Sequence, residues 1–378
     1  MTKPMHEGAC MIKVCHMTSA YKSDDLRIFH KECLSLAKAG YDVYIVAPGE
    51  SYEQNGIRII GSTLTSGGRF RRMTQGAKSV YEKALGIDAD LYHIYDPELL
   101  PYAMKLKKLK KKVIFDSRED FVETILEKQY LPLFLRFLLY IYFKIYYSLT
   151  MGKYDAIITV SPHISKKLEK QNKNTHVITN YPIINDRLDL KKYTISKNVI
   201  YAGGISSQWC HDTIIIALGN CDGIRYLLLG PGEENYINSL KELPNWKSVD
   251  YYGRVSIDEV INEYKNASIG IAVMTYNRNV GNKTGTLGNT KIFEYMAEAL
   301  PIVCTDYVLW KEIVDKYACG ICVNPYSSDE IANAINYLID NHEIAKEMGQ
   351  NGRRAVLEEY NWDMEEIKLL SIYRKLFL

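Results

Sequence analysis

The 378-residue sequence has little of several features that mark specialised classes of protein. Its charge is almost balanced, with 47 Lys and Arg against 45 Asp and Glu, so the net charge of +2 gives no support for binding nucleic acid. Phe and Trp are few, at 9 and 4, whereas Tyr is abundant at 30. Tyrosine is amphipathic and suits half-buried surfaces, sugar-stacking walls and membrane interfaces. The apolar content of 47% is that of a globular protein, and the length favours two domains.

The sequence also lacks the marks of export. Its first residues include Lys3, His6 and Glu7 and no apolar segment, so we expect no signal peptide. The eight cysteines are scattered in mostly apolar contexts, which is typical of reduced thiols in a cytoplasmic protein. Cys319 and Cys322 form a C-x-x-C pair, but no redox-active helix follows them, and we expect a structural role.

The segment 131–149 is rich in Leu, Phe, Ile and Tyr and carries only two charges, Arg136 and Lys144. These lie eight residues apart and share one narrow polar stripe on a helix, and they argue against a membrane-spanning segment. Two alternatives follow. The helix is largely buried with a thin wet edge, which we favour, or it lies in a bilayer surface with its cations at the headgroups. The six lysines of 105–112 are interpreted as a solvated helix face.

Strand-like and helix-like segments alternate along the chain in two series. The first series includes a helix at 27–38 and strands at 12–16, 43–47, 91–94, 113–115, 156–160 and 176–179. The second series includes strands at 199–202, 226–229, 269–273, 302–304 and 321–323 and helices at 257–265, 290–299, 329–340 and 342–359.

This order predicts an α/β fold with two Rossmann-like domains of parallel strands, which face each other across a ligand cleft. A polar stretch without clear periodicity, 186–198, follows the first series. We therefore predict an N-terminal domain at 1–182, a C-terminal domain at 183–360 and a last helix at 361–378.

The most informative segment is 288–301, which predicts a polar loop, a short helix and a stop at Pro301 before an apolar strand. The helix entrance at Gly288, Asn289 and Thr290 leaves several backbone N–H groups free. Together with the helix dipole, these groups suit an anion.

Two charged residues extend this prediction. Lys291 adds a positive charge in the first turn, and Glu294, one turn further on, points roughly the same way and can accept hydrogen bonds from hydroxyls. The segment therefore fits a phosphate at the helix tip beside a hydroxyl-rich sugar, as in a nucleotide sugar. A solvated Lys–Glu pair on an amphipathic helix is the alternative.

This segment resembles the donor-site helix of family 4 glycosyltransferases of the GT-B type, in which a Lys precedes Glu-Tyr-Met-Ala and a proline opens the next strand. The resemblance implies that Glu294 contacts the nucleotide ribose and that the amides around Asn289 and Thr290 face the phosphates. Many relatives carry a second acid, with seven residues between the two. Here that position is Thr286, which carries no charge. The resemblance also implies that the last helix crosses back onto the N-terminal domain.

Two glycines, Gly203 and Gly204, follow the first strand of the second series and allow a close backbone approach to a phosphate or sugar. Relatives usually follow this turn with an Arg or Lys, whereas the loop up to His211 has no cation. We predict that Arg254 replaces it, with Lys283 and Lys291 assisting. A plain tight turn and a surface charge are the alternatives.

Charged groups also lie at the ends of two strands of the first series: His93 is in one strand and Asp96 follows it, and Arg118 and Glu119 follow the next. Loops at the ends of parallel strands converge, so we predict that these residues share a rim beside the reacting sugar or its acceptor. His93 as a buried core histidine, and the others as a surface ion-pair cluster, are the alternatives.

These runs resemble the His-Asp-Pro-Glu-Leu and Asp-x-His-Glu motifs of a bacterial polysaccharide branch of family 4, with Tyr95 and Arg118 in place of the motif histidines. An early segment resembles the same branch's Asp-x-Arg-Ile. It makes Asp25 and Arg27 candidate acceptor contacts, although Asp25 also suits a helix cap.

The resemblance implies a retaining, metal-independent glycosyltransferase without a cofactor, which moves a sugar from a nucleotide diphosphate sugar to a glycan or lipid-linked acceptor. It further implies bacterial surface polysaccharide synthesis, for example of a capsule, at the cytoplasmic face of the membrane. Two rivals remain: a nucleotide-sugar epimerase or hydrolase on the same fold, with Asp96, Glu119 or His211 activating water, and a non-catalytic binding partner of a transferase.

Overall fold

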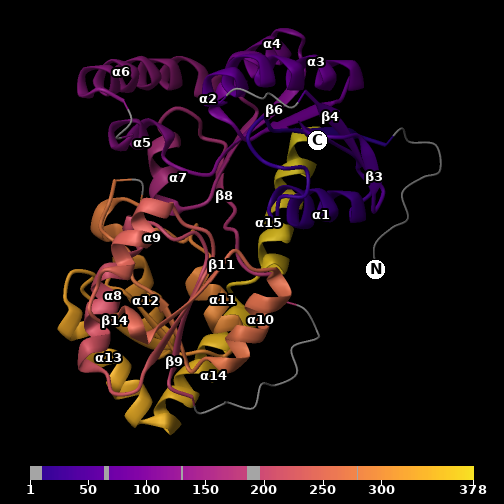
Figure 1. Ribbon diagram of the computed structural model, residues 1–378. Coiled ribbons are helices and arrows are strands. Elements are labelled where there is room, and N and C mark those ends of the chain that lie inside the picture. The colour runs from indigo at the N-terminus through magenta and orange to yellow at the C-terminus, as the bar shows by residue number, and fades with distance from the viewer. Residues whose placement is uncertain (1–10, 64–67, 129–130, 185–195, 279) are drawn as a thin grey trace, which may run out of the picture. The chain divides into compact units, whose positions relative to one another are not determined.

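The computed structural model describes residues 11–63, 68–128, 131–184, 196–278 and 280–378 (Figure 1). The chain divides into two compact units. The first comprises Met1–Thr179 together with Glu365–Leu378, and the second comprises Asn180–Met364. The sequence placed these boundaries at 182/183 and 360/361. The polar stretch 186–198 and the N-terminal residues used to argue against a signal peptide lie mostly outside the described residues.

The first unit is built on a sheet with the strand order β3-β4-β2-β1-β5-β6-β7-β8. Its strands are β1 (Lys13–Met17), β2 (Asp42–Pro48), β3 (Tyr52–Gln54), β4 (Ile57–Ser62), β5 (Leu91–Ile94), β6 (Lys112–Ser117), β7 (Ala156–Thr159) and β8 (Thr175–Val177). All neighbouring strands pair in parallel except β3 with β4. The residues of β5 and β7 are all buried, as expected for strands covered on both faces.

Helices cover this sheet in the alternation that a parallel sheet requires. The α-helices are α1 (Leu34–Lys38), α2 (Gly68–Arg71), α3 (Ala77–Ile87), α4 (Leu100–Lys108), α5 (Phe121–Glu127), α6 (Leu133–Thr150), α7 (Pro162–Leu168) and α15 (Trp362–Phe377). Short π and 3₁₀ turns extend several of them: η1 (Ile28–Cys33), η2 (Arg72–Gly76), η3 (Pro97–Leu99) and η4 (Met151–Lys153).

The last helix, α15, returns to the first unit, as predicted. In Figure 1 its yellow ribbon lies beside α1. Its Tyr373 is fully buried and contacts the ring of Tyr41 edge-on, with 5.8 Å between ring centroids. Its Glu365 accepts a hydrogen bond from the Thr179 backbone N–H at 3.0 Å. The residues from Glu365 onward therefore complete the core of the first unit.

The second unit has a wholly parallel sheet with the order β11-β10-β9-β12-β13-β14. Its strands are β9 (Asn198–Ala202), β10 (Arg225–Leu229), β11 (Val249–Gly253), β12 (Ile269–Ala272), β13 (Ile302–Thr305) and β14 (Gly320–Val323). Its α-helices are α8 (His211–Ala217), α9 (Glu234–Lys241), α10 (Ile257–Asn266), α11 (Lys291–Ala297), α12 (Val308–Tyr317), α13 (Ser328–Asp340) and α14 (His342–Glu358). Its 3₁₀ turns are η5 (Ser207–Trp209), η6 (Leu218–Asn220), η7 (Trp246–Ser248) and η8 (Asn282–Thr284).

The predicted α/β fold with two Rossmann-like units is confirmed, and the structure adds elements that the sequence analysis did not predict. The strands β3 and β4 form a short antiparallel pair at one sheet edge. All three residues of β3 are exposed, so this strand lacks the apolar run on which the predicted strands rest. The ranges of β4 and β11 were not predicted either.

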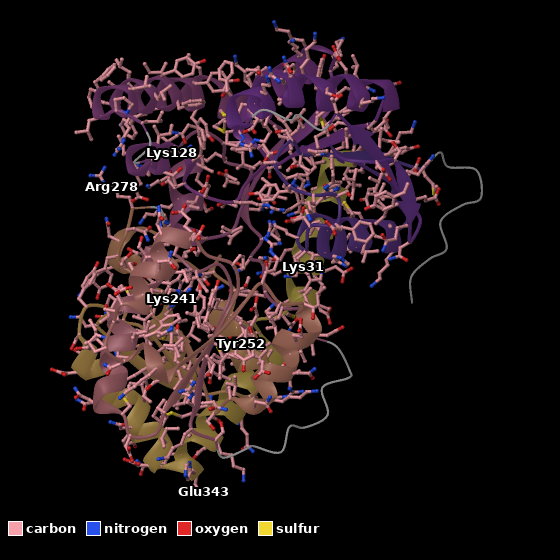
Figure 2. All side chains as sticks on the ribbon, in the orientation of Figure 1. Lys31, Lys128, Lys241, Tyr252, Arg278 and Glu343 are labelled. Atoms are coloured by element: carbon pink, nitrogen blue, oxygen red, sulfur yellow. The ribbon has the colours of Figure 1, made fainter. Side chains whose placement is uncertain are left out.

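The expectation that the helix at 131–149 is largely buried is wrong, because most of α6 is exposed. Within Leu133–Thr150, only Tyr147 and Thr150 are buried. Its exposed apolar side chains, with exposed fractions from 39% to 77%, are Leu133, Phe134, Phe137, Leu138, Ile141, Tyr142, Ile145 and Leu149. Figure 2 shows side chains standing out from α6 on the side away from α5. None of the described helices combines the length and the apolarity needed to cross a bilayer.

Candidate functional site

The loop before α11 is held by its own polar side chains. The Thr286 hydroxyl accepts a hydrogen bond from the Gly288 N–H at 3.0 Å, and the Asn289 side-chain oxygen accepts one from the Lys291 N–H at 3.2 Å. Asn289 therefore satisfies one of the amides that the sequence left free for an anion. Because α11 has only seven residues, its dipole is small, and the charge of Lys291 dominates this end of the helix.

Lys291 lies against the glycine pair after β9. A Cβ placed on Gly203 would lie 2.1 Å from the Lys291 Nζ, so a larger residue there would displace the ammonium. Gly203 also has a φ of +148°, a conformation that favours glycine. The structure thus brings together two motifs that are 88 residues apart in the sequence (291 minus 203).

Two aromatic rings hold the Lys291 ammonium. Its Nζ lies 5.1 Å from the ring centroid of Tyr201 and 5.0 Å from that of Trp209, within the range of cation–π attraction. Burial lowers the pKa of Lys291, and the Glu294 charge opposes that shift. Among the residues that the structure describes, no carboxylate lies within 4 Å of this ammonium. Lys291 is only partly buried, and a cation without an ion pair is a strong partner for an anion.

Glu294 is fixed in place beside Lys291. Its carboxylate accepts hydrogen bonds from the Thr290 hydroxyl at 2.6 Å and from the Tyr264 hydroxyl at 3.3 Å. Tyr264 comes from α10 and packs edge-on against Tyr295, with centroids 5.6 Å apart. Carboxylate oxygens have further lone pairs, so Glu294 can still accept hydrogen bonds from a ligand's hydroxyls.

Sequence reasoning missed the residues that support this site: Tyr201, Trp209, Tyr264 and Gly230. A Cβ on Gly230 would lie 1.9 Å from the Gly203 carbonyl oxygen, so the ends of β9 and β10 meet as bare backbone. The run Gly230-Pro231-Gly232 at a strand end was a usable signal. The aromatic residues gave none, because single tyrosines in apolar segments are ordinary core residues.

Arg254 lies apart from this cluster. It is exposed and directly follows β11, the edge strand of the sheet. Strand β10 lies between β11 and β9, so the strands of Arg254 and Gly203 are about 10 Å apart. Lys283 is exposed and forms an ion pair with Asp306 at 3.7 Å, which neutralises part of its charge.

In the first unit, Asp96 lies at the end of β5 with its carboxylate turned inward. One oxygen accepts hydrogen bonds from the Thr18 hydroxyl at 2.8 Å and from the backbone N–H groups of Ser19 and Ala20 at 2.6 and 3.3 Å. Burial, with the charge of Glu98 added, raises the pKa of Asp96 to about 6.

Arg118 and Asp25 pair beside Asp96. The Arg118 guanidinium donates to Asp25 at 2.8 Å and lies over the rings of Tyr21 and Tyr95, 4.0 and 5.1 Å from their centroids. Asp25 also accepts from the N–H groups of Arg27 and Ile28 at 3.1 and 3.0 Å, which confirms the predicted helix cap.

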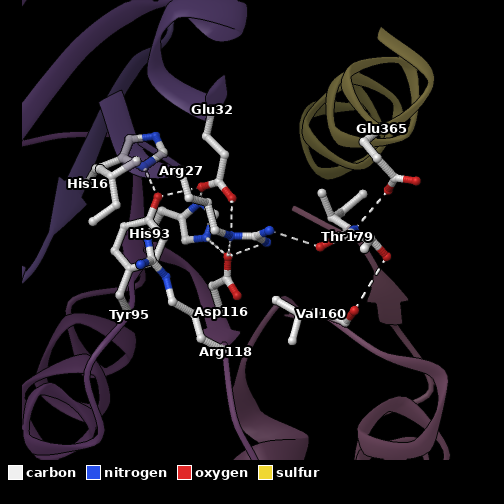
Figure 3. A network of polar contacts seen from close by, with 12 residues as sticks. His16, Arg27, Glu32, His93, Tyr95, Asp116, Arg118, Val160, Thr179 and Glu365 are labelled. Carbon is white, nitrogen blue, oxygen red and sulfur yellow. Dashed lines mark hydrogen bonds and ion pairs between the residues drawn. The ribbon is translucent and has the colours of Figure 1, made fainter. Parts of the chain in front are cut away.

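Arg27 and His93 lie in the core instead (Figure 3). The Arg27 side chain is 2% exposed and bonds to Asp116 at 2.7 Å, to Glu32 at 2.9 Å and to the Ile178 carbonyl at 2.9 Å. The prediction that Arg27 contacts an acceptor does not fit this burial, because its guanidinium is fully engaged by internal partners.

His93 is fully buried, which is the alternative that the sequence left open. Its Nδ1 lies 2.7 Å from the Tyr373 hydroxyl, and burial lowers its pKa to about 3. A neutral histidine held inside the core is a structural residue, so the predicted catalytic role of His93 does not fit its surroundings. Arg118 is partly exposed and Glu119, shortly after β6, is exposed, whereas Asp96 is buried. The predicted role of these three residues beside the acceptor or the reacting sugar stays a prediction.

One group of side chains has metal-ligand chemistry within the described ranges. His16, Glu32 and His93 are fully buried, and their ligand atoms lie within 4.8 Å of one another. Tyrosine hydroxyls already bond to them: Tyr95 lies 2.5 Å from both the His16 Nδ1 and the Glu32 carboxylate. We interpret the group as a hydrogen-bond network.

Two protein families match the chain in succession. Residues 28–181 match the family described as Glycosyltransferase Family 4, and residues 184–355 match that described as Glycosyl transferases group 1. The chain belongs to the group 1 glycosyltransferases of the GT-B fold. The second match contains the whole cluster of Gly203, Lys291 and Glu294, and the first contains Asp96 and Arg118.

Curated relatives match parts of this group 1 chain. An uncharacterised glycosyltransferase of Methanocaldococcus jannaschii is 24% identical over 227 residues, which are 59% of this chain and 60% of that protein. The GDP-mannose-dependent α-(1-6)-phosphatidylinositol monomannoside mannosyltransferase of Mycobacterium tuberculosis is 26% identical over 171 residues, 43% of each chain. The matched part thus spans less than two thirds of these relatives.

Solved structures match nearly the whole chain and show the fold. Sucrose-phosphate synthase from Thermosynechococcus elongatus has a TM-score of 0.75 at 18% identity and covers 97% of this chain and 99% of its own. WaaG, a glycosyltransferase involved in lipopolysaccharide biosynthesis, has a TM-score of 0.71 at 12% identity, with 96% and 99% covered. Anabaena HepE in complex with UDP and glucose has a TM-score of 0.70 at 14% identity, with 96% and 100% covered.

Proposed function

We propose that this group 1 glycosyltransferase transfers a sugar from a nucleotide diphosphate sugar to a glycan or lipid-linked acceptor, with retention of the anomeric configuration. The observation that carries the proposal is Lys291, a partly buried cation without an ion pair among the described residues, held by Tyr201 and Trp209 against Gly203. A diphosphate supplies the negative charge that would pair with this ammonium, and the absence of a side chain on Gly203 leaves room for the ammonium itself.

The chemistry is stabilisation of the leaving group. As the bond between sugar and phosphate breaks, charge develops on the diphosphate and the sugar becomes cation-like. A cation held in a water-poor site stabilises that charge without reorganising. Lys291 is the main charge and Arg254 a second one at the outer strand. Because these two cations can compensate the diphosphate, we propose that the reaction needs no metal. In this proposal the donor phosphate takes the proton of the acceptor.

Glu294 is proposed to bind the nucleotide. Its carboxylate is oriented by Thr290 and Tyr264 and accepts hydrogen bonds from ribose hydroxyls. Two similar proteins involve nucleotides: Anabaena HepE forms a complex with UDP and glucose, and the mycobacterial mannosyltransferase is GDP-mannose-dependent. These similarities support a nucleotide sugar as donor.

The acceptor is proposed to meet the first unit at Asp96, Arg118 and Glu119. The pKa of Asp96, raised to about 6 by burial, brings its protonation within reach of physiological pH. Bacterial surface polysaccharide synthesis, at the cytoplasmic face of the membrane, is the proposed setting.

Helix α6 is proposed to lie on the surface of an anionic bilayer. Its exposed apolar residues include Phe134, Phe137 and Leu138, each more than half exposed. Its two charges, Arg136 and Lys144, are both cations, so the helix carries no carboxylate that anionic headgroups would repel. Such a contact would bring a lipid-linked acceptor to the enzyme.

A flotation assay tests the membrane contact. Phe137→Glu should abolish flotation with liposomes that contain phosphatidylglycerol. Ile257→Glu, at a 74% exposed apolar residue of α10 in the second unit, is the matched control and should float like the wild type. Equal flotation of both variants would sink the proposal.

The donor site is tested by thermal shift with UDP, GDP, ADP and their sugars, without added metal, followed by a transfer assay with the nucleotide that binds. A bound nucleotide well above its Kd should stabilise the protein by a few kcal/mol. Donor hydrolysis or epimerisation without transfer would favour the rival enzymes. If no nucleotide raises the melting temperature, the non-catalytic partner becomes the better interpretation; Thr286, which replaces an acid, favours that rival.

A further inference from the structure

A cavity of about 310 Å³ lies wholly within the first unit. Helices α5, α6 and α7 form its walls, and the loop after β6 forms its floor. It is lined, among others, by Glu119, Asp120, Tyr140, Lys144, Tyr147 and Lys167. Its volume is at the small end of the range of roughly 300–1,000 Å³ that is usual for small-molecule sites.

The hydroxyl of Tyr147 marks this cavity as a binding site. Tyr147 is 7% exposed and lines the cavity, and its buried Oη has no hydrogen-bond partner among the described residues. Burial raises the pKa of Tyr147 well above its usual value, so the group stays an O–H donor. A buried hydroxyl without a partner is unfavourable unless something else supplies an acceptor.

The charged side chains around the cavity balance one another, and this balance indicates the kind of ligand that the cavity fits. Three carboxylates, of Glu119, Asp120 and Glu123, face three ammonium groups, of Lys144, Lys167 and Lys170. Lys167 and Asp120 form an ion pair with each other. A lining without net charge favours a neutral polar ligand over a diphosphate, which would need an excess of cations.

The side chains of the cavity are those that recognise sugars. Phe121 and Tyr140 contribute aromatic carbon to the lining, and aromatic rings pack well against the C–H face of a sugar ring. The carboxylates accept hydrogen bonds from sugar hydroxyls, and Tyr147 donates one to a ring or hydroxyl oxygen.

We propose that this cavity binds the saccharide end of the acceptor. The inference rests on the proposed function and extends it, because it names a chemical class and a place for the acceptor. Helix α6 contributes Tyr140 and Tyr147 to the cavity and carries exposed apolar residues elsewhere on its surface. One helix would then serve both the sugar and the lipid of a lipid-linked saccharide.

Saturation-transfer NMR on the full chain tests the proposal. The probes are the methyl glycosides of glucose, galactose, mannose and N-acetylglucosamine at millimolar concentration. The wild type should give transfer to the ring protons of at least one. Tyr147→Phe removes only the hydroxyl and should weaken that binding about fivefold, as expected for one hydrogen bond. Tyr140→Ala, which removes an aromatic wall, should abolish it.

The control is Tyr337→Phe, at a 45% exposed tyrosine of α13 in the second unit, which should bind like the wild type. The melting temperature of Tyr147→Phe should equal or exceed that of the wild type, because the variant loses an unpartnered buried hydroxyl. A clear fall would show that the hydroxyl has an internal partner, and it would overturn the inference.

Two further results bear on the inference. If no glycoside binds while a nucleotide raises the melting temperature, the cavity inference is overturned and the proposed donor function stands. If a glycoside binds and responds to Tyr147→Phe although no nucleotide binds, the cavity inference is supported and the proposed transferase function fails.

Discussion

The two units treat their buried charges in opposite ways. In the first, Arg27 meets Asp116 and Glu32 inside the core, and each charge compensates another. In the second, Lys291 is partly buried between two aromatic rings without an ion pair in the described chain. A compensated cluster holds a fold together, whereas an uncompensated cation is available for a ligand. Burial of a charge therefore says little about function until its partners are known.

Removing Arg27, the cation of the compensated cluster, should give the largest effect, a loss of folding stability. Arg27→Met leaves the buried Asp116 carboxylate without its ion-pair partner and should destabilise the protein by about 3–5 kcal/mol. Urea unfolding measures this. Arg58→Met, at a half-exposed pair with Asp42, is the control and should cost less than about 1 kcal/mol. Equal costs would mean that the core cluster is not what stabilises the first unit.

Removing the uncompensated cation should impair function without loss of stability. Lys291→Met should lower the transfer rate about 10²–10³-fold, as for other single groups that stabilise developing charge. Steady-state kinetics with the nucleotide sugar identified by thermal shift measures this. Lys283→Met removes an exposed lysine from the same segment and should lose much less. A Lys291→Met variant with normal turnover would refute the donor site.

The next effect concerns pH. Burial, with the charge of Lys291 added, lowers the pKa of His211 from 6.5 to about 3. Its contribution to stability is full above pH 6.5 and is lost as the pH falls towards 3. Between about pH 6.5 and 5 this single group should cost about 2 kcal/mol. His211→Gln, which does not titrate, should lose correspondingly less on acidification, as measured by urea unfolding at both pH values.

The first unit should respond to acid differently, which sharpens the comparison. His93 has a similarly lowered pKa of about 3, but burial raises the pKa of Glu32 from 4.5 to about 8. Protonation of Glu32 in the folded state adds stability as the pH falls from about 8 towards 4.5, which offsets part of the loss from His93.

The smallest expected effect concerns Tyr264, which orients Glu294. Tyr264→Phe keeps the packing against Tyr295 but removes a hydrogen bond of 3.3 Å, so KM for the nucleotide sugar should rise several-fold while kcat changes little. Tyr252→Phe, at an exposed residue of β11, is the control. A change in kcat alone would show that Tyr264 does not contribute to binding of the nucleotide in the ground state.

The fold could be predicted from the sequence because buried parallel strands are continuous apolar runs, which can be recognised locally. It also predicted that Gly203, Lys291 and Glu294 belong to one region, because their motif resembles a known one. It did not predict the rings around Lys291 or the burial of Arg27, since side-chain partners distant in sequence leave no periodic pattern. For α6, apolar content was taken as burial, but composition does not state which side of a helix is covered.

Helix α15 also has a consequence for the order in which the chain folds. Tyr373 contacts His93 from 280 positions later in the sequence, so the first unit lacks part of its core until the ribosome has translated the whole second unit. The second unit, Asn180–Met364, is continuous and can finish first. The earliest segment to emerge is thus the last to be completed, and in the meantime it exposes apolar surface that chaperones recognise.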